Sequence, residues 1–187
     1  MEPSLEPVAC RSVLVIGPAR SGKSRYALGL AEATAADRLY LATAEPGDAE
    51  MADRIAHHRA ERGAGWRTCE APLDLAAALS EAARPGRVVL VDCLTLWLSN
   101  LMMSNLNIET QIAGFMDVLA DLPGPAVIVA NEVGAGIVPA TPLGRAFRDW
   151  HGRLNQAAAA ACDAVVVVQA GLPTQLKPAP RPAIQLR

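Results

Sequence analysis

The chain has 187 residues, of which 51% are hydrophobic and 19% charged, and its 17 basic and 19 acidic residues give a formal net charge of -2. This length and balance predict one compact domain with an extensive core and argue against intrinsic disorder. Because the chain has no basic block, we expect no nucleic-acid partner, and any polyanion that it binds must be small.

The sequence contains neither a membrane segment nor an export signal that we can identify. Asp92 and Asp163 interrupt the two longest apolar runs, whereas a membrane-spanning helix needs about 20 apolar residues. The first residues carry two glutamates where a secretory signal has a basic start and an apolar stretch. We therefore expect a cytoplasmic protein with no membrane span. Four scattered cysteines without a metal-ligand spacing predict reduced thiols.

Short runs rich in Val, Ile and Leu alternate with longer amphipathic or alanine-rich segments along the chain. This alternation is typical of parallel strands joined by helices. The expected strands cover residues 12–17, 38–44, 88–93, 126–131 and 164–169. The expected helices cover residues 22–35, 48–62, 73–83, 94–105, 109–120 and 143–162. Because several strands are apolar on both faces, we predict an α/β fold, an open, mostly parallel sheet with helices on both faces.

The carboxyl-terminal segment differs in composition from the rest of the chain. Residues 173–187 contain four prolines, and this composition favours an extended or loose chain over a packed element. We therefore predict a single domain over residues 1–177, followed by a proline-rich tail over residues 178–187.

A glycine-rich loop directly follows the first expected strand. Residues 17–24 fit the GxxxxGK[ST] pattern of a P-loop, in the strand, loop and helix context that this motif requires. The glycines let backbone amides point at phosphate oxygens beside a helix N-terminus, whose dipole also favours anions. Lys23 would bring a positive charge to the β- and γ-phosphates, and Ser24 would offer its hydroxyl to Mg²⁺. The predicted nucleotide-binding residues are Gly17, Pro18, Ala19, Arg20, Ser21, Gly22, Lys23 and Ser24.

A carboxylate at the end of a nearby strand usually completes the metal shell of a P-loop site. Asp92 ends the apolar run of residues 88–91, where a carboxylate is costly to bury without a purpose. We therefore predict that Ser24 and Asp92 hold Mg²⁺ on the phosphates. The chain lacks the NKxD pattern with which switch GTPases bind guanine, so a signalling GTPase is not expected.

One histidine occupies a position from which it could reach a ligand. On a helical wheel of residues 48–62, His57 lies opposite the apolar side. That apolar side consists of Met51, Ala52, Ile55, Ala56 and Ala60. Asp53 lies one turn before His57, where its carboxylate could hold one ring nitrogen and leave the other nucleophilic. A histidine on a polar face is often merely solvated, so the wheel alone leaves both interpretations open.

Two further segments could contact a ligand. Residues 131–139, NEVGAGIVP, follow the fourth expected strand, and open α/β sheets bind ligands beyond the carboxyl ends of their strands. An ordinary strand-to-helix loop is the alternative. In the next helix, Arg145, Arg148 and Asp149 share one face. That face could bind a phosphate, and salt bridges between the neighbours are at least as good an interpretation.

Taken in order, these motifs resemble the bifunctional adenosylcobinamide kinase/adenosylcobinamide-phosphate guanylyltransferase family of cobalamin biosynthesis. The resemblance covers residues 12–177 and rests on five ordered blocks. The blocks are GPARSGKSRYA, LYLATA, DAEMADRIAHHRAERGAGWRTCEAP, VLVDCLTLWLSNLM and NEVGAGIVPATPLGRAFRDWHGRLNQAAAAACDAVVVVQAG. Pro18 departs from the glycine that relatives often have there, and the residues from 178 onward extend past the usual end of the family.

The resemblance implies a P-loop NTPase fold of the RecA-like type, two reactions and a homotrimer. In the first reaction ATP or GTP phosphorylates the aminopropanol hydroxyl of adenosylcobinamide. In the second, GMP passes from GTP to that phosphate and pyrophosphate leaves. The family's guanylylated histidine matches His57. Beyond the P-loop, the family's nucleotide contacts match Thr43, Ala44, Glu45, His58, Arg59, Ala60, Glu61, Glu70 and Asp92.

Two other functions stay open at this point. The chain could be a P-loop kinase of another small alcohol, or a module that uses the nucleotide as a switch. A covalent guanylyl label on the protein would separate the first interpretation from both alternatives. Stimulation of nucleotide turnover by a hydroxylated acceptor would then distinguish the kinase from the switch.

Overall fold

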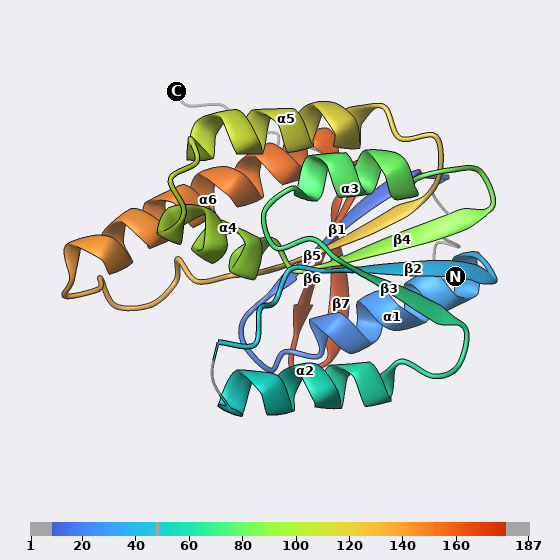
Figure 1. The fold of residues 1–187 in the computed structure, drawn as a ribbon, viewed down its shortest axis with the longest axis horizontal. Helices are drawn as coiled ribbons and strands as arrows, with labels where there is room; N and C mark the ends of the chain where they lie inside the picture. The colour runs from blue at the N-terminus through green and yellow to red at the C-terminus, as the bar shows by residue number, and fades with distance from the viewer. Residues whose placement is uncertain (1–8, 48, 179–187) are drawn as a thin grey trace, which may run out of the picture.

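A computed structural model describes residues 9–47 and 49–178, without the side chains of Glu50, Arg54, His58 and Glu61. Figure 1 shows a single sheet with helices on both of its faces. The strands are β1 (Ser12–Gly17), β2 (Asp37–Ala42), β3 (Trp66–Glu70), β4 (Arg87–Asp92), β5 (Ala126–Asn131), β6 (Ala164–Gln169) and β7 (Leu172–Lys177). The helices are α1 (Lys23–Thr34), α2 (Ala49–Glu61), α3 (Leu75–Ala82), α4 (Leu94–Met103), α5 (Ile108–Ala120) and α6 (Pro142–Ala161).

The strand order is β3-β2-β4-β5-β1-β6-β7. All neighbouring strands are parallel except β6 and β7, which are antiparallel. This arrangement confirms the predicted open, mostly parallel sheet. It also brings the carboxyl ends of six strands to one edge, where ligands of such sheets bind.

The core has two layers, one on each face of the sheet. Alternate residues of β1, β4 and β5 pack against α1, where Ala27 and Ala31 are fully buried and allow the helix to lie close to the sheet. The other face is covered by α3, α4, α5 and α6, around the buried ring pair of Trp97 and Phe115. In Figure 1, α1 and α2 lie below the sheet and the other four helices lie above it. Because both faces are covered there, β1, β4, β5 and β6 are apolar on both sides.

Two strands, β3 and β7, were not expected from the sequence. In β3 only Trp66 is partly buried and the other residues are exposed, so the strand has no apolar run. β7 is extended, as the prolines favour, but residues 173–177 pair with β6, which corrects the expectation that this segment forms no packed element. A two-residue turn joins them, with positive φ at both Ala170 and Gly171, as type I′ hairpins require. Pro173 is tolerated because β7 is an edge strand.

Lys177 ties the last strand to the last helix. Its Nζ donates hydrogen bonds to the carbonyls of Ala159, Ala160 and Cys162, at 3.0, 3.0 and 2.5 Å. A cation at the end of α6 satisfies carbonyls that have no partner within the helix, and it also favours the helix dipole. Residues 179–187 of the predicted tail lie outside the described residues.

All four cysteines are free. Cys93 and Cys162 are buried, and burial raises the pKa of each thiol to about 12, so both pack as neutral groups. None of the helices in the described ranges combines the length and the apolar content that crossing a bilayer requires.

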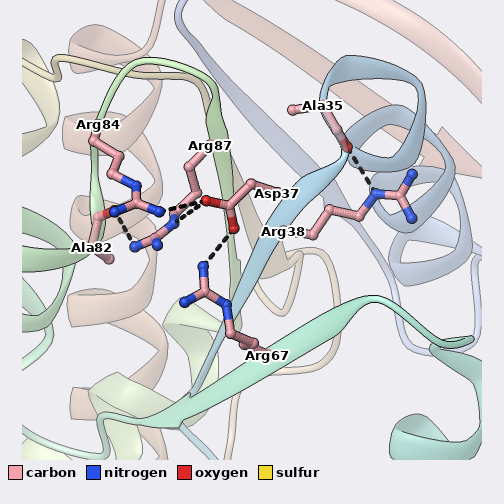
Figure 2. Close-up of polar contacts among 7 residues, drawn as sticks. All are labelled: Ala35, Asp37, Arg38, Arg67, Ala82, Arg84 and Arg87. Atoms are coloured by element: carbon pink, nitrogen blue, oxygen red, sulfur yellow. Dashed lines mark hydrogen bonds and ion pairs between the residues drawn. The ribbon is translucent and has the colours of Figure 1, made fainter.

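Three arginines surround one carboxylate at the edge of the sheet opposite the carboxyl ends of its parallel strands (Figure 2). Asp37 begins β2, and its Oδ2 lies 2.7 Å from Nη2 of Arg84 and 3.1 Å from Nε of Arg87. Its other oxygen accepts from Arg67 on β3. Arg87 is almost buried and also donates to the carbonyl of Ala82. The cluster therefore joins the starts of β2 and β4 to the exposed edge strand.

We expect Asp37→Asn to lower the thermal midpoint at neutral pH, because three guanidiniums would lose their carboxylate. Hydrogen bonds from Arg84, and then from Arg67 and Arg87, hold the pKa of Asp37 well below its usual value. A lowered pKa in the folded state stabilises the protein above the unfolded pKa of about 3.9, and that stability is lost as the pH falls further.

Thermal melts of wild type, Asp37→Asn and the exposed control Asp117→Asn from neutral to acidic pH test this expectation. The deficit of Asp37→Asn should be largest near neutrality and should shrink in acid. A variant as stable as wild type at neutral pH, or a deficit independent of pH, would contradict the role given to this cluster.

Candidate active site

The P-loop connects β1 to α1 at the carboxyl edge of the sheet. Gly17 is buried, and a Cβ there would lie 2.3 Å from the carbonyl oxygen of Val168, so no other residue fits. Gly22 has a φ of 93° and faces the Cα of Gly171 closely, so a side chain there would be strained as well as crowded. The loop backbone therefore has the curled form that the sequence predicts.

Several polar groups of the loop are arranged for an anion. Lys23 is only 8% exposed, and its Nζ lies 3.3 Å from the carbonyl oxygen of Pro18 across the loop. The hydroxyl of Ser21 is buried without a hydrogen-bond partner. Helix α1 begins after Gly22 with no side-chain cap and no acidic residue in its first turn. A buried lysine, an unsatisfied hydroxyl and an uncapped helix N-terminus together fit a bound phosphate.

The remaining loop residues are accessible. Ser24 is half-buried at the start of α1, and Pro18, Ala19 and Arg20 are exposed around the loop. Ser24 directly follows Lys23 in the first turn of α1, where the motif has the residue predicted to contact Mg²⁺.

The strand register aligns the other predicted residues along the same edge. Ala42 at the end of β2 pairs with Asp92 of β4 on one side and with Glu70 of β3 on the other. On the far side of β5, Gly17 pairs with Asn131. The structure therefore places Glu70 and Asp92 at neighbouring strand ends, with the P-loop two strands from Asp92.

Thr43 links the ends of β2 and β4. Its buried hydroxyl donates to the carbonyl of Cys93 and accepts from the amide of Cys93, both at 2.8 Å. Asn100 donates to the carbonyl of Thr43 at 2.8 Å. These bonds hold the Thr43 side chain in the interior, whereas Ala44 is half-buried and Glu45 is exposed.

Asp92 has a buried neighbour that also contacts the end of α2. Burial, followed by the charge of Asp92, raises the pKa of Tyr40, so the phenol keeps its proton. The guanidinium carbon of Arg62 lies 3.6 Å from the centre of the Tyr40 ring, and Arg62 is itself buried. Arg62 directly follows α2, so this cation–π contact fixes the end of the helix beside Asp92.

The side of helix α2 that the helical wheel predicts to be apolar is only partly buried. Of the five residues on its apolar side, Met51 and Ile55 are half-buried and the three alanines are exposed. His57 is exposed, in agreement with its predicted polar position. Arg59 lies 4.0 Å from Glu70, with both side chains mostly exposed, which is a weak ion pair. The side chains of His58 and Glu61 lie outside the described part of the structure, and Ala60 is exposed.

The contacts described for α2 place it near the β2–β3 end of the sheet. Arg62 lies over β2, and Arg59 approaches the end of β3. Two strands, β4 and β5, separate β2 from the P-loop strand β1. Three strand spacings correspond to about 14 Å. The carboxyl end of α2 thus lies over the half of the sheet that is farther from the P-loop.

Hydrogen bonds to the P-loop and within the segment hold the glycine-rich loop after β5 in place. The amide of Glu132 donates to the carbonyl of Gly17 at 2.9 Å, and the Glu132 carboxylate accepts from the amide of Gly134. Arg145 donates to the carbonyls of residues 139 and 140, while Arg148 pairs with Asp149 at 3.2 Å. A salt bridge is therefore present between Arg148 and Asp149, whereas Arg145 anchors the loop.

Sequence reasoning missed a buried polar group beneath the same edge. Thr95, His151 and Asn155 are each at most 9% exposed and gather around the backbone of Asn131. Burial lowers the pKa of His151, and the charge of Glu132 opposes this shift. The available signal was the spacing of His151 and Asn155, one turn apart on the buried face of α6.

A mostly parallel sheet with a GxxxxGKS loop between its first strand and first helix defines a P-loop NTPase. The structure resembles the ATPase EscN of the enteropathogenic E. coli type III secretion system, with a TM-score of 0.57 and 11% identity, over 86% of this chain and 43% of that chain. This likeness supports the fold alone.

The chain belongs to the cobinamide kinase / cobinamide phosphate guanyltransferase family, whose model matches residues 13–176. It is 47% identical to the bifunctional adenosylcobalamin biosynthesis protein CobP of Pseudomonas aeruginosa over 169 residues, which cover 89% of this chain and 98% of the relative. It is 38% identical to the corresponding protein CobU of Salmonella typhimurium over 180 residues, 88% and 99% of the two chains. The resemblance inferred from the sequence is thereby confirmed.

Proposed function

We propose that this chain phosphorylates adenosylcobinamide with ATP or GTP and then transfers GMP from GTP to adenosylcobinamide phosphate through a guanylylated histidine. The products would be adenosylcobinamide-GDP and pyrophosphate. The observation that carries the proposal is a P-loop whose buried, unsatisfied Ser21 hydroxyl and uncapped helix N-terminus fit a phosphate. The chain that contains this loop matches the family over residues 13–176.

In the kinase step the acceptor hydroxyl attacks the γ-phosphorus, and the bond from that phosphorus to the nucleoside diphosphate breaks. Lys23 and the loop amides stabilise the negative charge on the transferred group and on the leaving diphosphate. Ser24 and Asp92 supply the hydroxyl and carboxylate oxygens that Mg²⁺ prefers, so these two residues would hold it. When bound, Mg²⁺ neutralises charge on the β- and γ-phosphate oxygens.

In the transfer step neutral His57 attacks the α-phosphorus of GTP, a P–N bond forms, and the bond to pyrophosphate breaks. The phosphate of adenosylcobinamide phosphate then attacks the same phosphorus and releases the histidine. This sequence divides one difficult displacement into two easier ones. The exposed position of His57 supports the role, since the imidazole is accessible to a nucleotide.

The loose packing of α2 supports the same step. We propose that α2, whose three apolar-side alanines are exposed, pivots about the contact of Arg62 with Tyr40 and carries His57 toward the phosphates. We propose that the nucleotide is also contacted by residues 43–45 and 58–61, by Glu70 and by Asp92.

We further propose a cytoplasmic homotrimer. Side chains such as Ile137, Met103 and Leu172, which are 97%, 76% and 71% exposed, leave apolar surface for contacts between subunits. Sedimentation analysis of the purified chain would measure the oligomeric state directly.

Two assays on the purified chain test the proposed activities. Adenosylcobinamide with ATP or GTP should give adenosylcobinamide phosphate, and addition of GTP should then give the GDP-linked corrinoid and pyrophosphate. Nucleotide turnover that responds only to other alcohols would indicate a different kinase. Turnover that no acceptor stimulates would indicate a switch module.

A further inference from the structure

Asn131 ends β5 at the carboxyl edge, directly beside the P-loop. Its register partner on β1 is Gly17, the first residue of the loop. Val127 and Val129 of β5 belong to the core layer under α1, and side chains alternate along a strand, so Asn131 continues on that same face. Its side chain therefore lies on the side of the sheet from which the P-loop enters α1.

The neighbouring strand places Asn131 between two parts of the site. β5 lies between β1, which carries the P-loop, and β4, which ends at Asp92. Asp92 pairs with Val129, two residues before Asn131. A terminal phosphate held by the P-loop on one side and by a metal on Asp92 on the other would lie above the end of β5.

Three buried polar side chains hold the Asn131 backbone from the opposite face. Its amide donates to Oγ1 of Thr95 at 2.8 Å, and its carbonyl accepts from Nδ2 of Asn155 at 3.0 Å. Nε2 of His151 lies 2.9 Å from the same Thr95 oxygen. Thr95 is on α4, whereas His151 and Asn155 are on α6. Two helices thus converge on the backbone of one residue, Asn131.

Burying these three polar side chains costs free energy, and a need to fix the position of Asn131 would explain that cost. Buried polar side chains lose hydration, and an apolar core at the same place would avoid that loss. Thr95 accepts from the Asn131 amide, so its own proton is satisfied when His151 is neutral and Nε2 accepts. Burial lowers the pKa of His151, which favours that neutral form. The contacts of Thr95, His151 and Asn155 form a clamp on Asn131. This clamp fixes the backbone position from which the Asn131 side chain extends.

We propose that the side-chain amide of Asn131 donates a hydrogen bond to the γ-phosphate of the bound nucleotide, and that Thr95, His151 and Asn155 are positioning residues for it. The proposal rests on the proposed nucleotide site. The end of β5 then recognises the γ-phosphate, the group that a triphosphate has and a diphosphate lacks.

Binding measurements with two nucleotides test the proposal. In Asn131→Ala we expect the affinity for the β,γ-imido analogue of GTP to fall about 10-fold, as for a lost hydrogen bond to a charged group. The affinity for GDP should stay within about two-fold, while the exposed control Asn105→Ala should change neither. Asn131→Asp, which preserves the shape, should discriminate against the triphosphate more strongly, because its carboxylate repels the γ-phosphate.

Equal losses for both nucleotides, or no loss for either, would overturn the assignment. Thr95→Val and Thr95→Ser test the clamp separately. The valine variant should lose affinity for the triphosphate selectively, and the serine variant should restore it because the hydroxyl is retained. A valine variant with lowered stability but an unchanged ratio of the two affinities would refute the positioning role. These measurements need no corrinoid, so their failure is distinguishable from failure of the proposed activities.

Discussion

Replacing Lys23 with alanine is expected to reduce kcat/KM for phosphorylation of adenosylcobinamide by at least about 100-fold, the usual effect of removing one preorganised charge-stabilising group. Lys23 is held nearly buried inside the loop, where its ammonium group would meet the β- and γ-phosphates. Its Nζ lies within reach of the Pro18 carbonyl of the same loop, so the core should be little affected. Initial rates with ATP and GTP, together with thermal melts, measure both effects.

Lys23→Arg is the matched variant for charge. It keeps a cation but replaces a compact ammonium with a planar guanidinium, which does not fit the same position between loop and phosphates. We expect an activity between wild type and the alanine variant. Unchanged turnover in Lys23→Ala would reject the loop as the phosphate site.

His57→Asn is expected to separate the two activities. Guanylyl transfer should fall by at least about 1,000-fold, because asparagine cannot form the covalent intermediate. Phosphorylation of adenosylcobinamide should continue, since the P-loop, Lys23 and Asp92 are untouched. Product analysis with each substrate in turn would show adenosylcobinamide phosphate accumulating without its GDP-linked derivative.

The adjacent histidine provides the comparison for that experiment. At saturating GTP, His58→Asn should still form the GDP-linked product, because the histidine proposed to attack phosphorus remains. Transfer that survives in His57→Asn and disappears in His58→Asn would show that His58, and not His57, is the nucleophile.

The sheet could be predicted from sequence where its strands are continuous apolar runs. β1, β4, β5 and β6 are buried on both faces, and a run of Val, Ile and Leu bounded by turns is sufficient to identify them. The two edge strands lack this signal. β3 is almost wholly exposed, and β7 contains a proline, so only pairing with a neighbour defines either strand.

The same distinction applies to the candidate site. The P-loop could be predicted because its chemistry is contained in eight consecutive residues. The support under Asn131 could not, because Thr95 and His151 are 56 residues apart and meet only through helix packing. The contact of Arg62 with Tyr40 and the packing of α2 depend likewise on tertiary structure. Local patterns identify the groups that meet the ligand, whereas the groups that position them come from distant segments.

The covalent intermediate on His57 is the central claim, and one measurement tests it most directly. The wild-type protein is incubated with GTP labelled at the α-phosphate, denatured and analysed for bound label. We expect label that is labile to acid and stable to base, as a phosphoramidate is, located in the peptide that contains His57 and absent from His57→Asn. A protein that retains no such label, or retains it undiminished in His57→Asn, would contradict the proposed mechanism.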